Sequence, residues 1–328
     1  MIMINRIVQS SACRPIISFI IPLYNGGKYI MGCVESINSS GFGHNEYEIV
    51  IVEDGSQDNS LQIATEIAEK TNNITLISQT NGGPGKARNE GVRNSLGKYV
   101  WFIDCDDLIT KEIQKAKALF NQDIDIIGIS IKEIDGPRII YSNCQNRIRH
   151  NIVLSGEDAI VSGFKPASAC ALIVKRDFLI RNSIKFRTDL IHEDVEFSYR
   201  VVALSGSLYY TDLAPYEYIK RDVSRSSVES HEKIKKLILD DIYLISIFTH
   251  LAQSVSPSAG TAILRHCNAM TMGVLTVVLK DKRLRRKEER RKILTKMDRL
   301  ALLPINFSIN EGCQKYMYIL MNFLVKVL

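Results

Sequence analysis

Short apolar runs alternate with helical patterns through the first half of the chain. Five runs have the length and the continuous hydrophobicity of strands that are covered on both faces of a sheet. They are Ile16–Ile21, Glu48–Val52, Ile74–Ser78, Tyr99–Ile103 and Ile124–Ile131. Helical patterns lie between them at residues 61–68, 86–95 and 113–120. This alternation predicts an α/β fold with an open, doubly wound, mostly parallel sheet between two layers of helices.

The pattern changes in the second half of the chain. Residues 138–213 mix short strand-like pieces with loops. From Ser230 onward apolar positions recur at helical spacing, and the final stretch, Tyr316–Leu328, is apolar and amphipathic. We therefore expect an α/β domain at residues 1–220 and a helical C-terminal region at residues 221–328.

Composition places the chain among ordinary folded proteins, with 45% hydrophobic and 24% charged residues. Its seven cysteines are scattered and form no C-x-x-C pair, which argues against a disulfide framework or a structural zinc site and fits a reducing cytoplasm. The sequence has no run of 18 apolar residues, and Met1–Arg14 is mixed and polar, unlike a signal peptide. We expect no bilayer-spanning segment and a cytoplasmic location.

Positive charge is concentrated in one segment, residues 280–296. This segment holds ten basic and three acidic residues, while the whole chain has a net charge of +6. Three interpretations stay open: a solvated helix in which Glu288 pairs with Lys292, a nucleic-acid site, or attraction to an anionic membrane surface. The segment has no aromatic residue for stacking on bases, so we expect no nucleic-acid partner. Together with the apolar C-terminal stretch, it favours peripheral attachment to the membrane over the solvated helix.

Polar, turn-rich segments follow four of the predicted strands. They are Pro22–Gly27, Glu53–Asp58, Gln79–Lys86 and Asp104–Asp107. The carboxyl ends of parallel strands meet at one edge of an open sheet, and ligands of such sheets bind there. The topology therefore predicts that these four segments form a single site.

The strongest chemical signal is Asp104-Cys105-Asp106-Asp107, directly after the fourth strand. Three carboxylates within four residues repel one another unless a cation lies among them. Mg²⁺ or Mn²⁺, also bound by phosphate oxygens, would relieve the repulsion. The alternative is a solvated acidic turn before a helix that begins near Thr110.

Two other loops have weaker signals. The carboxylates of Glu53–Asp58 can bind a base or a ribose, or they can simply form a strand-to-helix turn. The glycine-rich loop before residue 86 fails the Walker A pattern, because Thr80 and Ala87 occupy key positions, and Arg88 breaks the dinucleotide fingerprint. What stays is a turn that enters a helix whose basic N-terminus suits anions.

Together these segments resemble the family 2 glycosyltransferases, whose fold is called GT-A. The resemblance is carried by PLYNGGKYI, VEDGSQD and NGGPGKARNEGVRNSLGKYVWFIDCDD, which match in order and spacing across Ile17–Leu108. Farther on, Ile191–Phe197 with Arg200 is similar to the second acidic motif of that family. The resemblance implies that residues 1–220 form a GT-A-like, nucleotide-sugar-binding catalytic domain.

The resemblance also implies where the donor binds. Pro22, Tyr24 and Asp54 would line the pocket for the nucleotide base. Glu53 would lie nearby, although the family usually has Asp at that position. Arg88 would lie beside the base or the diphosphate.

The acidic residues would carry the chemistry. Asp104 would face the ribose and contribute to the metal site, Asp106 would hold the metal, and Asp107 would assist. Asp194 would be the catalytic base, and Glu193 would orient the acceptor. The cofactor implied is Mn²⁺ or Mg²⁺.

The implied function is inverting transfer of a hexosyl or N-acetylhexosaminyl group from a nucleotide diphosphate sugar, with UDP as the expected nucleotide. The expected acceptor is a saccharide or a lipid-linked saccharide of bacterial surface polysaccharide synthesis, used on the cytoplasmic face of the membrane. Two alternatives stay open. A sugar nucleotidyltransferase would need a basic glycine-rich loop where Pro22–Lys28 offers only Lys28. The intact Asp104, Asp106 and Asp194 argue against a catalytically silent sugar-nucleotide-binding module.

One basic segment outside these motifs has two interpretations. Lys220, Arg221 and Arg225 follow the strand-like residues Tyr216–Tyr218. The segment either closes over the diphosphate as a lid that excludes water or is an ordinary linker between domains.

Overall fold

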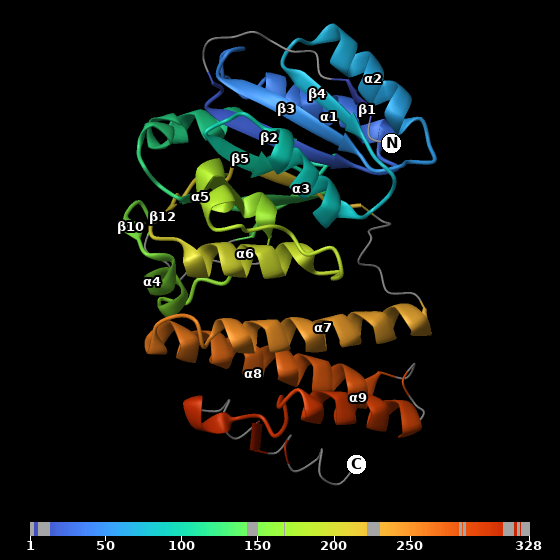
Figure 1. The fold of residues 1–328 in the computed structure, drawn as a ribbon, viewed down its shortest axis with the longest axis vertical. Helices are drawn as coiled ribbons and strands as arrows, with labels where there is room; N and C mark the ends of the chain where they lie inside the picture. The colour runs from blue at the N-terminus through green and yellow to red at the C-terminus, as the bar shows by residue number, and fades with distance from the viewer. Residues whose placement is uncertain are drawn as a thin grey trace. The chain divides into compact units, whose positions relative to one another are not determined.

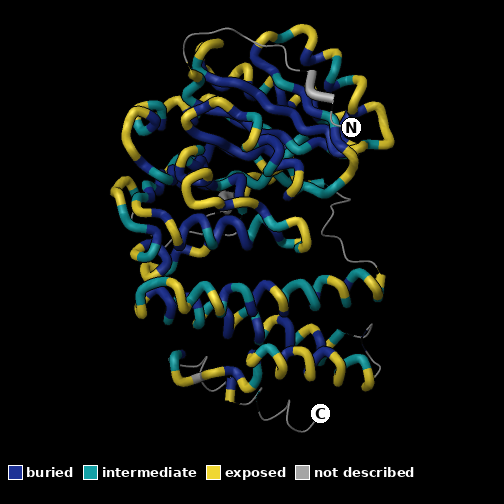
Figure 2. The backbone as a smooth tube through the Cα atoms, in the orientation of Figure 1, coloured by how far each residue is buried: buried dark blue, intermediate teal, exposed yellow. Residues whose placement is uncertain are grey.

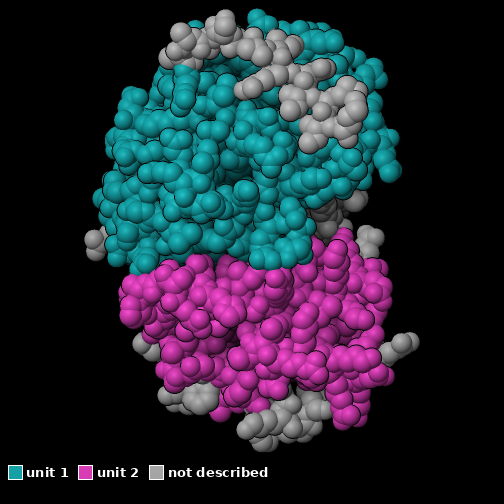
Figure 3. All heavy atoms as spheres, viewed as in Figure 1, with its two compact units in different colours: residues 1–189, 193–222 teal, residues 190–192, 223–328 magenta. Residues whose placement is uncertain are grey.

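The structure is a computed structural model that describes residues 3–5, 14–142, 150–166, 168–221, 230–281, 284, 287–310, 318–319 and 322. The chain divides into two compact units, which Figure 3 shows in different colours. The α/β unit comprises residues 1–189 and 193–222, and the helical unit comprises residues 190–192 and 223–328.

The described part of the α/β unit is built on a nine-stranded sheet with the order β1-β4-β3-β2-β5-β11-β7-β12-β10 (Figure 1). The strands are β1 Met3–Asn5, β2 Ile17–Leu23, β3 Tyr47–Glu53, β4 Ile74–Ser78, β5 Tyr99–Phe102, β7 Ile126–Gly128, β10 Val153–Leu154, β11 Leu172–Lys175 and β12 Leu208–Tyr210. The four neighbours β4, β3, β2 and β5 run parallel, as the sequence predicts. Strand β11 runs antiparallel to both β5 and β7, so the sheet as a whole is mixed.

Helices cover both faces of the parallel centre. They are α1 Gly27–Asn38, α2 Ser60–Lys70 and α3 Pro84–Asn94, followed later by the 3-10 helix η1 Lys111–Asn121, α4 Gly156–Val161, the 3-10 helix η2 Ala169–Ala171, α5 Arg176–Arg181 and α6 Glu193–Leu204. Side chains alternate along a strand, so Phe19 of β2 packs in one core with α1 and α2, whereas Ile20 meets α3 at Gly91. Covering both faces explains why β3 is buried along its whole length (Figure 2).

The fifth predicted strand, Ile124–Ile131, is wrong as a single element. The chain leaves the main sheet after β7 and enters a second sheet with the order β6-β13-β8-β9. Its strands are β6 Leu108–Ile109, β8 Ile131–Asp135, β9 Arg138–Ser142 and β13 Tyr216–Ile219. The backbone N–H of Ser130 bonds to the carbonyl of Leu213 at the change of sheet, 2.8 Å away. The apolar run therefore serves two sheets, which hydrophobicity alone does not distinguish.

The helical unit contains α7 His231–Leu251, α8 Pro257–Lys280, α9 Lys287–Arg299 and the 3-10 helix η4 Phe307–Ile309. The side chains of Ser230 and Ser256 cap α7 and α8, which pack on each other through buried residues such as Ile245 and Leu275. These helices confirm the predicted helical C-terminal region. The predicted apolar stretch Tyr316–Leu328 lies mostly outside the described residues.

Helix α8 is long and apolar enough to cross a membrane by length and composition, a test that core helices also pass. Its polar residues bond within the helical unit. Arg265 donates to the carbonyl of Ile309 at 2.5 Å, and Asn268 donates to Asn310 at 2.6 Å. Helix α8 packs against α7, and 39% of its apolar window is buried in the structure.

Candidate functional site

The loops at the carboxyl ends of the parallel strands contact one another. The backbone N–H of Asn25 donates to the Ser56 hydroxyl at 3.0 Å, and the Asn25 side chain accepts from the N–H of Gln57 at 2.8 Å. A Cβ added to Gly26 would lie 2.5 Å from the Cys105 sulfur, so the loops after β2 and β5 also touch. The loops therefore meet at one edge of the sheet, as the topology predicts, and their role as a binding site stays a prediction.

The carboxylates after β3 are buried and bonded within the protein. Asp54 accepts bonds from the Gln79 side chain at 2.7 Å and from the N–H groups of Gly82 and Gly83 at 2.9 and 2.8 Å. Glu53 accepts from the N–H of Ser56 at 2.5 Å. In this structure both residues shape the loops of the rim, and their predicted contacts with a nucleotide stay a prediction.

The other predicted base-pocket residues lie at the end of β2. Pro22 and Tyr24 are both half-buried. Tyr24 borders the acidic loop, because its backbone N–H bonds to the Cys105 thiol. Burial, together with the charges of the neighbouring carboxylates, raises the pKa of that thiol to about 12.

Arg88 joins the two acidic motifs. Its guanidinium donates to Asp104 at 2.9 Å and to Glu193 at 2.8 Å, although Glu193 lies 105 positions away in the sequence. Burial lowers the pKa of Arg88, but the surrounding charges, including those of Asp104, Glu193 and Asp194, raise it overall. The guanidinium is therefore a permanent positive charge between the loop after β5 and the first turn of α6.

Aromatic packing holds Arg88 in place. The guanidinium lies 5.3 Å from the centre of the Phe186 ring, which stacks on Phe197 at 3.7 Å. Asn89 clamps this segment, because it donates to the Phe186 carbonyl and accepts from the Phe186 N–H, each at 2.8 Å. Gly85 permits the approach, since a Cβ there would lie 2.5 Å from the Arg187 carbonyl oxygen.

The acidic loop after β5 presents two partly exposed carboxylates. The side chains of Asp104 and Asp106 are 40% and 39% exposed. Asp104 gives one oxygen to Arg88, whereas Asp106 makes a looser ion pair with Arg221 at 3.7 Å. Burial and then the charge of Asp104 raise the pKa of Asp106, while Arg221 opposes the shift.

Asp107 has a different position from the other two carboxylates. It is buried, and it accepts bonds from the Tyr216 hydroxyl at 2.6 Å and from the N–H of Ile219 at 2.9 Å. Burial and then the charge of Asp104 raise its pKa to about 8. Both donors belong to β13, so Asp107 fixes that strand to the acidic loop.

The second acidic motif begins α6. Glu193 is buried and Asp194 is half-buried in the first helical turn. Burial raises the pKa of Glu193 and so does the charge of Asp194, while Arg88 lowers it. Glu193 is therefore held by Arg88, and Asp194 lies beside it in the same helical turn.

The acidic loop could hold a divalent cation only if other molecules supplied part of the coordination. Within the described residues, no group of three or more His, Cys, Asp or Glu side chains is arranged to hold a metal. The side chains of Asp104 and Asp106 are partly exposed, so they could hold a hard cation whose other ligands would be phosphate oxygens and water.

Sequence reasoning missed two neighbours of this loop. The Cys170 sulfur lies 3.8 Å from Asp104, and the Tyr29 ring lies 3.9 Å from the guanidinium carbon of Arg221. Tyr29 lies within the segment PLYNGGKYI but was not predicted as a site residue, and Cys170 belongs to none of the quoted motifs. Their contacts with the acidic loop arise only through folding, so the spacing of residues along the chain does not reveal them.

The fold agrees with known structures at low sequence identity. The crystal structure of Staphylococcus aureus TarS 1-349 in complex with UDP-GlcNAc has a TM-score of 0.71 at 21% identity, over 94% of this chain and 88% of that one. The mannosyltransferase PcManGT of Pyrobaculum calidifontis, in complex with GDP-Man and Mn²⁺, has a TM-score of 0.57 at 17% identity, over 96% and 86%. The mixed sheet and the acidic loops at its edge define the chain as a protein of the GT-A fold.

Sequence comparison gives the family. Residues 18–175, just under half of the chain, match the model of glycosyl transferase family 2, so the chain contains a domain of that family. YibD, an uncharacterized glycosyltransferase of Escherichia coli, is 30% identical over 218 residues, which are 64% of this chain and 63% of YibD. The poly(ribitol-phosphate) beta-N-acetylglucosaminyltransferase TarS of Staphylococcus aureus is 29% identical over 52% of this chain and 34% of TarS. The chain thus spans less than two thirds of the length of either relative.

Proposed function

We propose that the chain is an inverting glycosyltransferase that moves a sugar from a UDP-sugar to an acceptor hydroxyl. The observation that carries this proposal is the position of Arg88 between Asp104 and Glu193. It brings the predicted donor-binding loop and the predicted acceptor-binding turn to the two sides of one guanidinium. The complex of TarS with UDP-GlcNAc supports UDP as the nucleotide, and the family 2 domain supports a nucleotide sugar as the donor.

Asp194 and Glu193 of the second acidic motif then have different roles in the reaction. Asp194 takes the proton from the acceptor hydroxyl while the oxygen attacks the anomeric carbon and the bond to the diphosphate breaks. Glu193 orients the acceptor, and its own position is fixed by Arg88. Attack from the face opposite the leaving group inverts the anomeric centre in one displacement, so no covalent sugar–enzyme intermediate forms.

A divalent cation would be held by Asp106 with help from Asp104. When bound, Mn²⁺ or Mg²⁺ supplies positive charge that stabilises the departing diphosphate. The complex of PcManGT with GDP-Man and Mn²⁺ supports this assignment. Pro22, Tyr24, Glu53 and Asp54 stay the proposed surroundings of the base.

The alternatives have less support. A catalytically silent module would not need a proton acceptor beside the donor loop, yet Asp194 stands next to the Arg88-bound Glu193. A nucleotidyltransferase would need a cationic loop after β2, and the buried Gly26 and Gly27 with Lys28 do not form one. We therefore assign the catalytic role to residues 1–220 and a supporting role to the helical region 221–328.

Slow release of UDP from a panel of UDP-sugars tests the enzyme without knowledge of its acceptor. The wild-type protein should hydrolyse one donor in the presence of Mn²⁺, and chelation should abolish that release. Asp106→Asn should abolish it too and should weaken the binding of UDP measured by calorimetry in the presence of Mn²⁺. Asp194→Asn should retain UDP binding but lose transfer once an acceptor is supplied.

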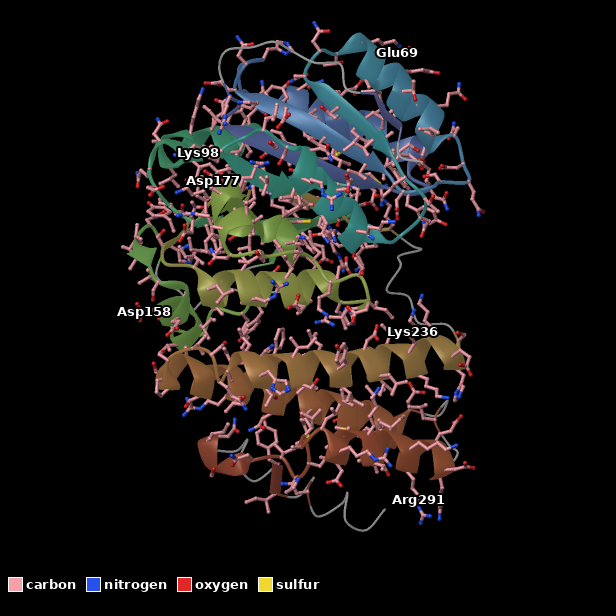
Figure 4. The ribbon with its side chains drawn as sticks, in the orientation of Figure 1. Glu69, Lys98, Asp158, Asp177, Lys236 and Arg291 are labelled. Atoms are coloured by element: carbon pink, nitrogen blue, oxygen red, sulfur yellow. The ribbon has the colours of Figure 1, made fainter. Side chains whose placement is uncertain are left out.

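Glu69→Gln is the matched control for the two substitutions. Glu69 is an exposed carboxylate on α2, labelled in Figure 4, and the same change of charge there should leave UDP release unaltered. The proposal fails if the wild-type protein neither binds nor cleaves any nucleotide sugar, or if Asp106→Asn behaves like this control.

We propose that the acceptor is a saccharide or lipid-linked saccharide of a bacterial surface polymer, reached on the cytoplasmic face of the membrane. The relative TarS is a poly(ribitol-phosphate) beta-N-acetylglucosaminyltransferase, which supports a polymer as the acceptor. Helix α9 supports attachment to an anionic bilayer, because Lys287, Arg291, Lys292 and Lys296 are exposed on it. The ion pair of Lys292 with Glu288, at 2.7 Å, is highly exposed and compensates little of this charge.

Flotation with vesicles tests the attachment. The protein should float with vesicles that contain anionic lipid and stay behind with neutral ones, and about 0.5 M salt should release it. Arg291→Gln with Lys296→Gln should reduce flotation, whereas Lys70→Gln with Lys111→Gln, an equal loss of charge from the α/β unit, should not. Recovery of all the protein in the soluble fraction would contradict the proposal.

A further inference from the structure

Arg221 covers the carboxylate that is proposed to hold the metal. Its guanidinium donates to the backbone carbonyl of Asp106 at 2.5 Å, and its Nε atom lies 3.7 Å from the Asp106 carboxylate. The guanidinium carbon also lies 3.9 Å from the centre of the Tyr29 ring on α1. A strand-end arginine, a helix-borne aromatic ring and the acidic loop therefore meet at one point.

The arm that carries Arg221 is anchored by the same acidic loop. Asp107 binds the Tyr216 hydroxyl and the backbone N–H of Ile219 at the two ends of β13, and Arg221 follows two residues later. Neighbouring carboxylates in one loop thus have different tasks. Asp107 fixes the strand, and Asp106 receives the arginine at its end.

The contact between Arg221 and Asp106 is incomplete. The Nε atom of Arg221 is buried, yet within the described residues it has no hydrogen-bond partner, because 3.7 Å to Asp106 is too long for one. The side chain is 29% exposed, so water competes with the pair. A guanidinium placed in this way offsets the charge of Asp106 only in part and is easily displaced by a stronger cation.

We propose that Arg221 is an internal counter-ion of the acidic loop that occupies the place of the divalent cation beside Asp106, so that this contact and metal binding exclude each other. The inference depends on the proposed function only for the metal site at Asp106. In the metal-free protein, Arg221 supplies the positive charge beside Asp106. Binding of the cation then displaces the guanidinium from Asp106. The freed guanidinium stays within reach through Tyr29 and β13, where it can satisfy its unpaired N–H with an anionic oxygen.

Binding of Mn²⁺ to the full chain without nucleotide tests this exclusion. Free Mn²⁺ is counted by electron paramagnetic resonance during titration of the wild-type protein and of Arg221→Gln. If the arginine contact is populated at roughly 80%, its removal strengthens apparent Mn²⁺ affinity about fivefold. Tyr29→Leu keeps the charge but removes the ring beneath it, and it should give a smaller gain.

Lys220→Gln is the matched control. It removes the same charge one residue away, from a side chain whose partners are Asp135 at 2.8 Å and Glu133 at 3.8 Å rather than the acidic loop. A circular-dichroism melt of each variant confirms folding. An unchanged or weaker affinity in Arg221→Gln, an equal gain in Lys220→Gln, or no Mn²⁺ binding by either wild type or Arg221→Gln would overturn the inference.

A second titration distinguishes failure of the exclusion between Arg221 and the metal from failure of the proposed function. The wild-type protein is titrated with Mn²⁺ in the presence of saturating UDP. If Mn²⁺ binds there but Arg221→Gln gives no gain without UDP, the metal site stands and the exclusion is wrong. If Mn²⁺ binds in neither condition, the metal-dependent function itself is wrong.

Discussion

Arg88 shows how one side chain links distant parts of the sequence. It is buried, and its two carboxylate partners come from the loop after β5 and from α6. Glu193 is nearly as buried, with 8% of its side chain exposed, so loss of Arg88 would leave its charge without compensation. The ion pair therefore positions the site and, once formed, becomes necessary to the fold around it.

Arg88→Met tests this dependence. We expect the free energy of unfolding to fall by about 3 kcal/mol, because Glu193 stays buried without its partner. We also expect UDP release from the donor to fall by at least about a hundredfold, since a misplaced site loses its orientation. Urea denaturation and a hydrolysis assay measure the two effects.

Arg93→Met is the control on the same helix. Its side chain is 67% exposed in a pair with Glu90, so the change should stay within about 0.5 kcal/mol. Equal destabilisation by the two substitutions would show that Arg88 has no special place in the fold.

Asp107 makes the free energy of unfolding depend on pH. Its pKa is raised to about 8, mainly by burial, whereas an unfolded aspartate titrates near 4. Between these values the folded chain binds more protons than the unfolded chain, so the free energy of unfolding falls as pH rises. The contribution is fully present below about pH 4 and is lost as pH passes about 8.

Asp107→Asn should remove this dependence. Asparagine resembles the protonated acid in shape and can still bond with Tyr216 and Ile219. With a chelator present, the loss of unfolding free energy between about pH 5 and pH 8 should be smaller in the variant than in the wild type, by about 1–3 kcal/mol. Parallel pH profiles for the two proteins would contradict the assignment.

At the scale of elements, α3 packs so closely on β2 that the contact cannot accept a larger side chain at Gly91. A Cβ added to Gly91 would lie 2.3 Å from the Cγ2 atom of Ile20, so the helix lies directly on the strand there. The same helix begins at Pro84 and carries Arg88 in its second turn. Close packing of the helix therefore fixes the height of Arg88 above the sheet.

Gly91→Ala should destabilise the protein by about 1–3 kcal/mol, because the helix must shift to admit the methyl group. Gly32→Ala in α1 is the control, since Gly32 is exposed and no atom of the described residues would lie within 4 Å of a Cβ added to it. This second change should stabilise the protein by about 0.5–1 kcal/mol through helix propensity alone. Chemical denaturation of both variants measures the difference, and similar signs for the two changes would refute the packing argument.

At the scale of the whole molecule, the metal and the nucleotide should depend on each other. At the proposed metal site, Asp106 and Asp104 alone would provide too few ligands to hold a divalent cation tightly, so phosphate oxygens would have to complete its coordination. UDP should therefore strengthen Mn²⁺ binding by about tenfold or more, and Mn²⁺ should strengthen UDP binding by the same factor. Calorimetric titration of each ligand with and without the other measures both factors.

The same coupling should appear in thermal stability. Mn²⁺ and UDP together should raise the melting temperature more than the sum of their separate effects, because both bind the folded chain. Asp106→Asn should retain a small effect of UDP and lose the additional effect of Mn²⁺. Additive shifts in the wild-type protein would mean that the two ligands bind independently.

The sequence by itself determined the strands of the parallel centre, helices α2 and α3 between them and the edge of the sheet where the polar loops meet, but it did not predict α1. Hydrophobic periodicity depends on neighbours in the chain, and the topology of a parallel sheet then places Asp54 and Asp104 at one edge. The prediction from hydrophobic periodicity was wrong for residues 124–131, because an apolar run does not reveal that β7 and β8 belong to different sheets.

Only the tertiary structure decided which acidic side chains are accessible and what holds them. It buried Asp107 under Tyr216, left Asp106 partly exposed beneath Arg221, and placed Arg88 against Glu193. The partners in these contacts are 109, 115 and 105 positions apart. Such pairings depend on how elements pack in space, which the spacing of residues along the chain does not record.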